Sequence, residues 1–169
     1  AERWVRAGQL AEDHLGDERR AIEAYERALA ADPDDLATEA TLGELWLRRG
    51  APEAALPHLL RAAAGLSDPE RAVELYMAAG RAAERCGHAD DARVAYAGVL
   101  EHHPTEQEAL ERASDLFTQV ESWDRAYDAA AALILHHEAR LSVKDRAQVY
   151  LRMAQARHGQ GDGEAALRL

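Results

Sequence analysis

Hydrophobic and polar residues follow one another along the chain with the spacing of amphipathic helices, and glycine or proline interrupts this pattern at short intervals. Helix starts are indicated where Asp precedes Pro, where Pro follows a turn glycine, and where Glu stands three residues after Thr. Such starts are predicted at Asp32-Pro33, Pro52, Asp68-Pro69 and Thr105 with Glu108. The pattern predicts helices over residues 2–15, 18–31, 34–49, 52–65, 69–86, 89–103, 105–119, 122–138, 143–158 and from 163.

The helices are predicted to come in pairs, because three columns of residue types recur in one register. An alanine column recurs at intervals of 34, 37, 34 and 40 residues: Ala21, Ala55, Ala92, Ala126 and Ala166. Five residues before each alanine stands a turn residue: Gly16, Gly50, Gly87, Glu121 and Gly161. Small residues form the third column, seven residues before the turn residue of the last four copies: Gly43, Gly80, Ser114 and Ala154. Copy one departs from this register, because Gly8 precedes Gly16 by eight residues. Each copy is therefore predicted to be two helices around a tight turn, with the alanine column buried where the helices meet.

The copies form one predicted array over residues 1–169. Their boundaries fall near 1–35, 36–70, 71–106 and 107–142, and a shortened fifth copy begins at 143. The two longer intervals place their extra residues between copies, around 65–68 and 138–142. We expect a lengthened helix or a wider connection at each of these two places.

One copy carries the residues of a known motif in order: Leu42, Gly43, Trp46, Gly50, Ala55, Leu59 and Ala62. This unit of 34 residues resembles the tetratricopeptide repeat, and the resemblance extends over essentially the whole chain. It implies an all-α fold, a right-handed α-solenoid of antiparallel helix pairs. It also implies that the first helix of each pair lines a concave groove, which in this family commonly holds an extended peptide or a partner helix.

Composition agrees with an all-helical chain and excludes several function classes. The 20 basic and 31 acidic residues give a formal net charge of −11, which disfavours nucleic acid or an anionic membrane surface as a partner. The single cysteine, Cys86, permits no internal disulfide, and we expect a cytoplasmic protein. The high Ala content, the single Lys among the basic residues and the absence of Asn are typical of a bacterial protein. Because the chain begins without Met, we expect a longer protein, with further repeats or domains beyond Leu169.

Three groups of residues suggest catalytic or metal chemistry, and each is better explained by the repeat. The pairs His102-His103 and His136-His137 stand where second helices end, and cations there complement the helix dipole. The glycines of 159–163 follow a predicted helix instead of a strand, and no Lys follows them as in a phosphate loop. Cys86 lies near His88 without a third orienting group. We therefore expect no enzyme activity, no cofactor and no metal site.

The resemblance places a candidate partner-binding groove on the first helices. Its predicted residues are Glu44, Arg48, Glu74, Met77, Arg81, Glu84, Arg85, Glu108, Glu111 and Asp115. Acidic groups are most frequent in copies one and four, so a basic or mixed-charge protein segment is expected to bind, with Arg81 and Arg85 anchoring any carboxylate on it. The chain has no Asn, on which the carboxylate clamp of one family sub-class relies, so that sub-class is not expected.

Two functions remain open from the sequence. The first is a protein–protein interaction scaffold that binds a peptide or helix of its partner in the groove. The alternative is a structural spacer or self-assembly segment of a larger protein, without a dedicated peptide site.

Overall fold

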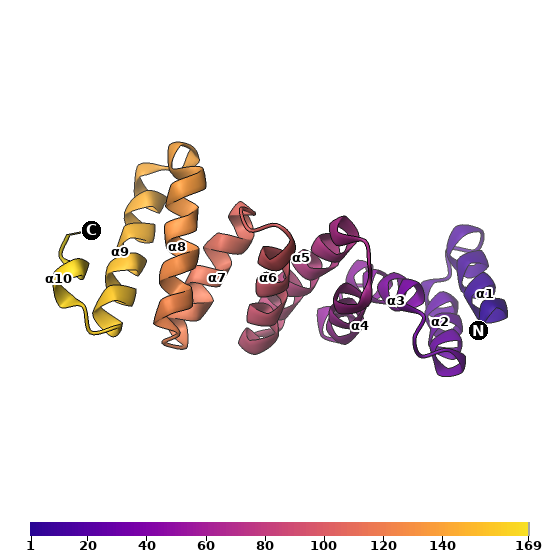
Figure 1. Ribbon diagram of the computed structural model, residues 1–169. Coiled ribbons are helices and arrows are strands. Elements are labelled where there is room, and N and C mark those ends of the chain that lie inside the picture. The colour runs from indigo at the N-terminus through magenta and orange to yellow at the C-terminus, as the bar shows by residue number, and fades with distance from the viewer. Residues whose placement is uncertain (169) are drawn as a thin grey trace. The chain divides into compact units, whose positions relative to one another are not determined.

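The computed structural model describes residues 1–168 and contains helices but no strand over that range. Its helices are α1 (Glu2–Asp13), α2 (Glu18–Ala31), α3 (Leu36–Arg48), α4 (Pro52–Gly65), α5 (Pro69–Cys86), α6 (Ala89–His102), α7 (Gln107–Gln119), α8 (Trp123–His137), the 3-10 helix η1 (Glu138–Arg140), α9 (Val143–Gly159) and α10 (Gly163–Ala166). The fold is all-α, as the sequence predicts, and consecutive helices are labelled along the chain in Figure 1.

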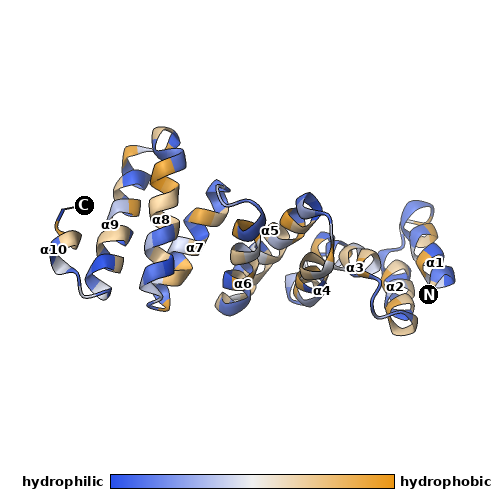
Figure 2. Cartoon of the chain, in the orientation of Figure 1, coloured by the Kyte–Doolittle hydropathy of each residue, from blue (hydrophilic) through white to orange (hydrophobic). Residues whose placement is uncertain are grey.

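The chain divides into two compact units, the first ending at His88 and the second beginning at Ala89. In the first unit, α1 packs against α2 and α3 against α4, while α4 also packs against α5. In the second unit, α7 packs against α8, and α9 packs against both α8 and α10. Figure 2 shows hydrophobic and hydrophilic residues alternating along the same helices, as expected when only one side of a helix is buried.

The alanine column is buried as predicted. Its first four members have no exposed surface: Ala21, Ala55, Ala92 and Ala126. The glycines of the small-residue column explain how closely the paired helices approach. A Cβ built on Gly8 would stand 2.6 Å from the ring of Tyr25, and one on Gly43 would stand 2.9 Å from the Leu59 side chain. Larger residues at these two positions would clash with the second helix of the pair.

Two of the predicted helix caps are wrong and one is confirmed. Asp68 caps α5, because its carboxylate accepts bonds from the N–H groups of Glu70 and Arg71 at 3.1 and 3.4 Å. Asp32 instead ends α2, and Asp35 caps α3.

The second wrong cap lies before α7. That helix follows Glu106, whose side chain makes no capping bond, so the predicted capping box of Thr105 does not form. The Thr105 carbonyl accepts a bond of 2.7 Å from the His137 ring.

The extra residues predicted between copies two and three and between copies four and five are both found, and each adds helical residues at the start of the later copy. The first lengthens α5 to 18 residues, compared with 13 in α3 and α7. The second adds the 3-10 turn η1 before α9, which has 17 residues. Leu169 lies outside the described residues.

The turn column needs left-handed backbone. The four glycines Gly16, Gly50, Gly87 and Gly161 have φ between 59° and 85°, and Glu121 adopts φ 56° at the same position of copy four. A side chain with a Cβ is strained in this region, whereas glycine is not.

Replacing Glu121 with Gly is expected to raise the free energy of unfolding by about 1 kcal/mol, because the strain of the left-handed residue is removed. Urea denaturation of the wild type and the variant measures this change. Glu121→Ala is the matched control, because it removes the carboxylate but keeps the Cβ. An equal gain from both substitutions would mean that the charge and not the backbone causes the effect.

Candidate partner-binding surface

A hollow of about 250 Å³ lies on the first unit between α1, α2 and α3. We call it the α1–α3 hollow; it is lined by Val5, Gln9, Glu12, Asp13, Tyr25, Asp35, Ala37, Thr38 and Thr41. Three of these residues carry carboxylates and none is basic. The hollow is therefore acidic, with apolar walls contributed by Val5 and Ala37.

Glu12 is the fixed acidic group of the α1–α3 hollow. Its carboxylate accepts a bond of 3.0 Å from the hydroxyl of Tyr25 and pairs with the guanidinium of Arg48. Burial and the neighbouring Glu12 carboxylate raise the pKa of Tyr25 well above its usual value, so this hydroxyl keeps its proton and remains a donor. Asp13 is exposed and makes the rim of the hollow negative.

A second hollow of about 340 Å³ lies between α7 and α9 of the other unit. We call it the α7–α9 hollow; its lining residues are Glu111, Arg112, Asp115, Leu141, Asp145, Gln148, Val149 and Arg152. Arg152 pairs with Asp115, and its guanidinium lies 3.5 Å from the hydroxyl of Ser114. Partial burial raises the pKa of Asp115, and the positive charges of Arg152 and Arg112 oppose this shift.

Ion pairs link the first helices of neighbouring copies within each unit. In the first unit, the guanidinium of Arg71 donates to Glu44 on α3 at 2.6 Å and to Glu74 on its own helix at 2.7 Å. The bond to Glu74 is the main reason why the pKa of Arg71 is raised. Arg48 and Arg152 make the equivalent links to α1 and α7. Several acidic groups of the predicted groove are thus already paired.

The structure places the predicted groove residues on two units. Seven of them lie on α3 and α5: Glu44, Arg48, Glu74, Met77, Arg81, Glu84 and Arg85. The other three lie on α7: Glu108, Glu111 and Asp115. Glu111 and Asp115 come together in the α7–α9 hollow, while Arg85 lines a separate hollow beside Cys86. A single groove across copies two to four remains a prediction.

Sequence reasoning missed Arg71 and Arg152, the basic partners of the acidic groups. Both stand before the small-residue column of their copy, outside the positions assigned to the groove. Arg71 belongs to the first turn of the lengthened helix α5, so the standard repeat register gives no signal for it. Arg152 stands two residues before Ala154, a position that also holds Arg6 and Arg112 in other copies, and this recurrence is the signal that could have indicated it.

The candidate metal and nucleophile residues occupy structural positions. His137 binds the Thr105 carbonyl and so holds the loop before α7. Within residues 1–168, His, Cys, Asp and Glu side chains form no group of three that could hold a metal ion. Cys86 is a free thiol at the end of α5. None of the helices described combines the length and apolar composition needed to cross a bilayer.

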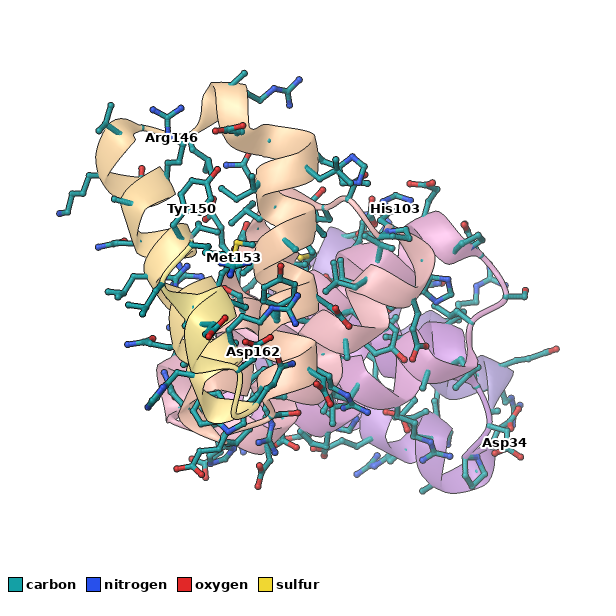
Figure 3. All side chains as sticks on the ribbon, turned by 60° about the vertical axis from the view of Figure 1, so that its left-hand side comes forward. Asp34, His103, Arg146, Tyr150, Met153 and Asp162 are labelled. Carbon is teal, nitrogen blue, oxygen red and sulfur yellow. The ribbon has the colours of Figure 1, made fainter. Side chains whose placement is uncertain are left out.

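Tyr150 and Met153 show how α9 completes the second unit. Both extend from α9 toward α8 in Figure 3, and Met153 is buried there. The hydroxyl of Tyr150 lies 3.4 Å from the carboxylate of Glu138 in η1, so the inserted turn is tied to the helix that follows it.

The comparisons with known proteins concern the repeat and the fold. Residues 1–35 match the family model of the tetratricopeptide repeat. No curated protein matches the sequence. Among solved structures, a MamA protein is similar, with 21% identity, a TM-score of 0.58, and coverage of 99% of this chain and 86% of that one.

Two further similar structures are described as tetratricopeptide-repeat proteins. YrrB, described as a TPR protein with an unusual peptide-binding site, has 16% identity and a TM-score of 0.61, with 98% of this chain and 80% of that one covered. A tetratricopeptide repeat protein from Parabacteroides merdae has 21% identity and a TM-score of 0.56, with 99% and 64% covered. Residues 1–35 thus match a tetratricopeptide repeat, and the chain as a whole shares the fold of these solved structures.

Proposed function

We propose that the chain is a protein-interaction scaffold and that it binds an extended peptide or a helix of its partner along its first helices. The observation that carries this proposal is the position of the two hollows, each formed between first helices of neighbouring copies. The resemblance to YrrB, whose description includes a peptide-binding site, supports a binding role. The proposed groove residues are those on α3, α5 and α7 named above, together with the lining of the two hollows.

A basic or mixed-charge partner segment suits the charge of both hollows. In the α1–α3 hollow, a Lys or Arg side chain could extend its aliphatic part along Val5 and Ala37 and place its charge near Asp13. The α7–α9 hollow carries both signs of charge, with Glu111 and Arg112 on one helix. An acidic surface raises the association rate of a basic segment, and this effect falls with salt.

A scaffold of this kind supplies binding surface and no chemical step. We therefore propose a non-enzymatic role, in which any activity belongs to the partner. We also propose the cytoplasm as its compartment, because the single cysteine offers no disulfide.

Selection of a random peptide library on the full chain tests the proposal directly. We expect enriched peptides to carry Lys or Arg, and their affinity to fall by about tenfold or more between low and high salt. The charge reversal Glu108→Lys/Glu111→Lys is expected to weaken those peptides that use copy four. Fluorescence anisotropy with a labelled peptide at two salt concentrations measures both effects.

Glu23→Lys/Glu26→Lys is the matched control, because it reverses two charges at exposed positions of α2 that lie outside both hollows. This variant is expected to retain binding. If no peptide is enriched, or if affinity ignores both salt and the reversal on α7, the groove proposal is wrong. The spacer function would then be the better account of the array.

A further inference from the structure

A third hollow, of about 660 Å³, lies in the first unit between the turn after α3 and the end of α5. We call it the turn-edge hollow; it is lined by Gly50, Ala51, Pro52, Glu53, Ala54, Arg85, Cys86 and His88. It shares no lining residue with the α1–α3 hollow or the α7–α9 hollow. The turn-edge hollow is therefore a surface separate from both.

A hollow also lies at the equivalent place one copy earlier, and its arginines are already paired. It has about 790 Å³ and lies between the turn after α1 and the end of α3, with Arg48 and Arg49 in its lining. Arg48 pairs with Glu12, and the Nε atom of Arg49 lies 3.9 Å from a carboxylate oxygen of Glu18. Both arginines at the end of α3 thus receive carboxylates from copy one.

The turn-edge hollow has an arginine at the equivalent position but lacks the carboxylate that would pair with it. Arg85 and Arg48 each stand two residues before the turn glycine of their own copy. Glu12 stands four residues before the turn glycine of copy one, and copy two has Trp46 at that position. No carboxylate of copy two therefore occupies the position from which Glu12 binds Arg48.

The acidic positions that follow the turn glycine of copy one are apolar in copy two. Asp17 caps α2 and Glu18 follows it, whereas Ala51 and Pro52 stand at the same two positions before and in α4. Glu53 is the only carboxylate among the residues that line the turn-edge hollow. The walls of this hollow are therefore mostly apolar where those of its counterpart are acidic.

Arg85 has donors that the described chain does not use. It is exposed at the end of α5 and makes no ion pair over residues 1–168. In the same unit, Arg48, Arg49 and Arg71 each have a carboxylate partner. A guanidinium can donate two parallel hydrogen bonds to one carboxylate, so an Asp or Glu side chain is the group that suits Arg85.

We propose that the turn-edge hollow is a second binding site and that it takes an acidic segment of a partner protein. A Glu or Asp side chain of that segment pairs with Arg85 and so supplies the carboxylate that copy two lacks. An aliphatic side chain beside it packs against Ala51, Pro52 and Ala54, which are partly exposed. The preferred charge is opposite to that of the α1–α3 hollow, so the array can hold a basic and an acidic segment at separate places.

Alkylation of Cys86 reports on this site, because Cys86 is the single cysteine of the chain and lines the turn-edge hollow. A random peptide library with acetylated and amidated ends is selected on the full chain, so that side chains supply the only carboxylates. We expect one enriched class to carry Asp or Glu beside an aliphatic residue, without Lys or Arg. Peptides of this class are expected to slow the reaction of Cys86 with iodoacetamide, as measured by mass spectrometry.

Arg85→Gln is expected to weaken these acidic peptides by at least about fivefold, because the charge-assisted bond is lost. Arg3→Gln is the matched control, because Arg3 is also an exposed arginine of the first unit and lines none of its hollows. Fluorescence anisotropy with a labelled acidic peptide measures both affinities, and circular dichroism confirms that the helices are intact.

A second variant supplies the missing carboxylate from within the chain. Ala51→Asp places an aspartate where Asp17 stands in copy one, and it can cap α4 as Asp17 caps α2. It is expected to melt at no lower temperature than the wild type and to bind acidic peptides more weakly. Basic peptides are expected to bind it as before, because Ala51 lines neither the α1–α3 hollow nor the α7–α9 hollow.

The proposal is overturned if the selection yields no acidic class, or if acidic peptides leave the alkylation of Cys86 unchanged. It is also overturned if Arg85→Gln binds acidic peptides as well as Arg3→Gln does. Failure of the first-helix groove would appear differently, as an absence of basic peptides while acidic peptides still protect Cys86.

Discussion

Replacement of Glu39 with Ala is expected to lower the free energy of unfolding by about 2 kcal/mol. The carboxylate of Glu39 is 4% exposed, and it lies 2.5 Å from Nδ1 of His58 and 3.0 Å from a guanidinium nitrogen of Arg61. All three residues belong to the hairpin of α3 and α4. Without the carboxylate, the His58 ring and the Arg61 guanidinium on α4 lose their acceptor, and water can replace it only partly because both groups are partly buried.

The partial exposure of the two partners limits the expected loss. His58 is 27% exposed and Arg61 is 48% exposed, so neither becomes a fully buried unpaired charge. Arg61 also keeps its bond to the carbonyl of Pro33. The expected value therefore falls below the range of about 3 to 5 kcal/mol that is typical when one member of a fully buried pair is removed.

Glu74→Ala is the matched control for this prediction. Glu74 also bonds to an arginine, Arg71, at 2.7 Å, but its side chain is 65% exposed. An exposed pair contributes between about 0 and 1 kcal/mol, so this variant is expected to unfold nearly as the wild type does. Urea denaturation of both variants measures the difference. If the two alanine variants lose equal stability, the burial of Glu39 contributes nothing to the hairpin.

The buried Glu39 could not be predicted from the sequence. It stands four residues before the small residue of its copy, a position that holds Trp4 and Leu110 in other copies. A lone glutamate on a predicted helix is ordinarily taken for a solvated side chain, and its partners stand 19 and 22 residues later. Whether they meet depends on the rotamers of three long side chains, which helix periodicity does not specify.

The wrong cap of α3 has a similar local cause. The segment from Asp32 to Asp35 offers three aspartates around a proline, and the Asp-Pro pair favours the first of them. The structure uses Asp35, whose carboxylate accepts bonds from both the N–H and the hydroxyl of Thr38, at 3.1 and 2.6 Å. The threonine three residues after Asp35 offers that carboxylate two donors, whereas the residue three positions after Asp32 is another aspartate.

The repeat register, in contrast, could be predicted because it depends on side-chain size at fixed intervals. A helix pair can approach closely only where the contacting side chains are small, and this requirement recurs in each copy. Columns of alanine and glycine therefore indicate buried helix contacts, whichever side chains surround them in a given copy. No such size requirement applies to the charged residues of the candidate site. The sequence therefore predicts the burial of Ala55 and Ala92 but not the ion pairs that Arg71 and Arg152 make.

Replacement of Ala55 with Leu is expected to lower the free energy of unfolding by about 2 kcal/mol, within the range of about 1 to 3 for an overpacked core. Ala55 has no exposed surface and lies on α4, in the hairpin where Gly43 already meets the Leu59 side chain. Three additional carbons at this position must displace α3 or force rotamers out of their preferred wells. Ala92→Leu tests the same column in the second unit and is expected to behave alike.

Ala64→Leu is the matched control, because Ala64 is exposed on the same helix as Ala55 and undergoes the same change in volume. A surface substitution of this kind is expected to change stability by no more than about 0.5 kcal/mol. Thermal and urea denaturation of the three variants give the comparison. If Ala55→Leu and Ala92→Leu unfold as Ala64→Leu does, the alanine column does not mark the helix contacts, and the repeat register built on it is wrong. A loss confined to the two column variants would instead show that helix proximity at this column stabilises each unit.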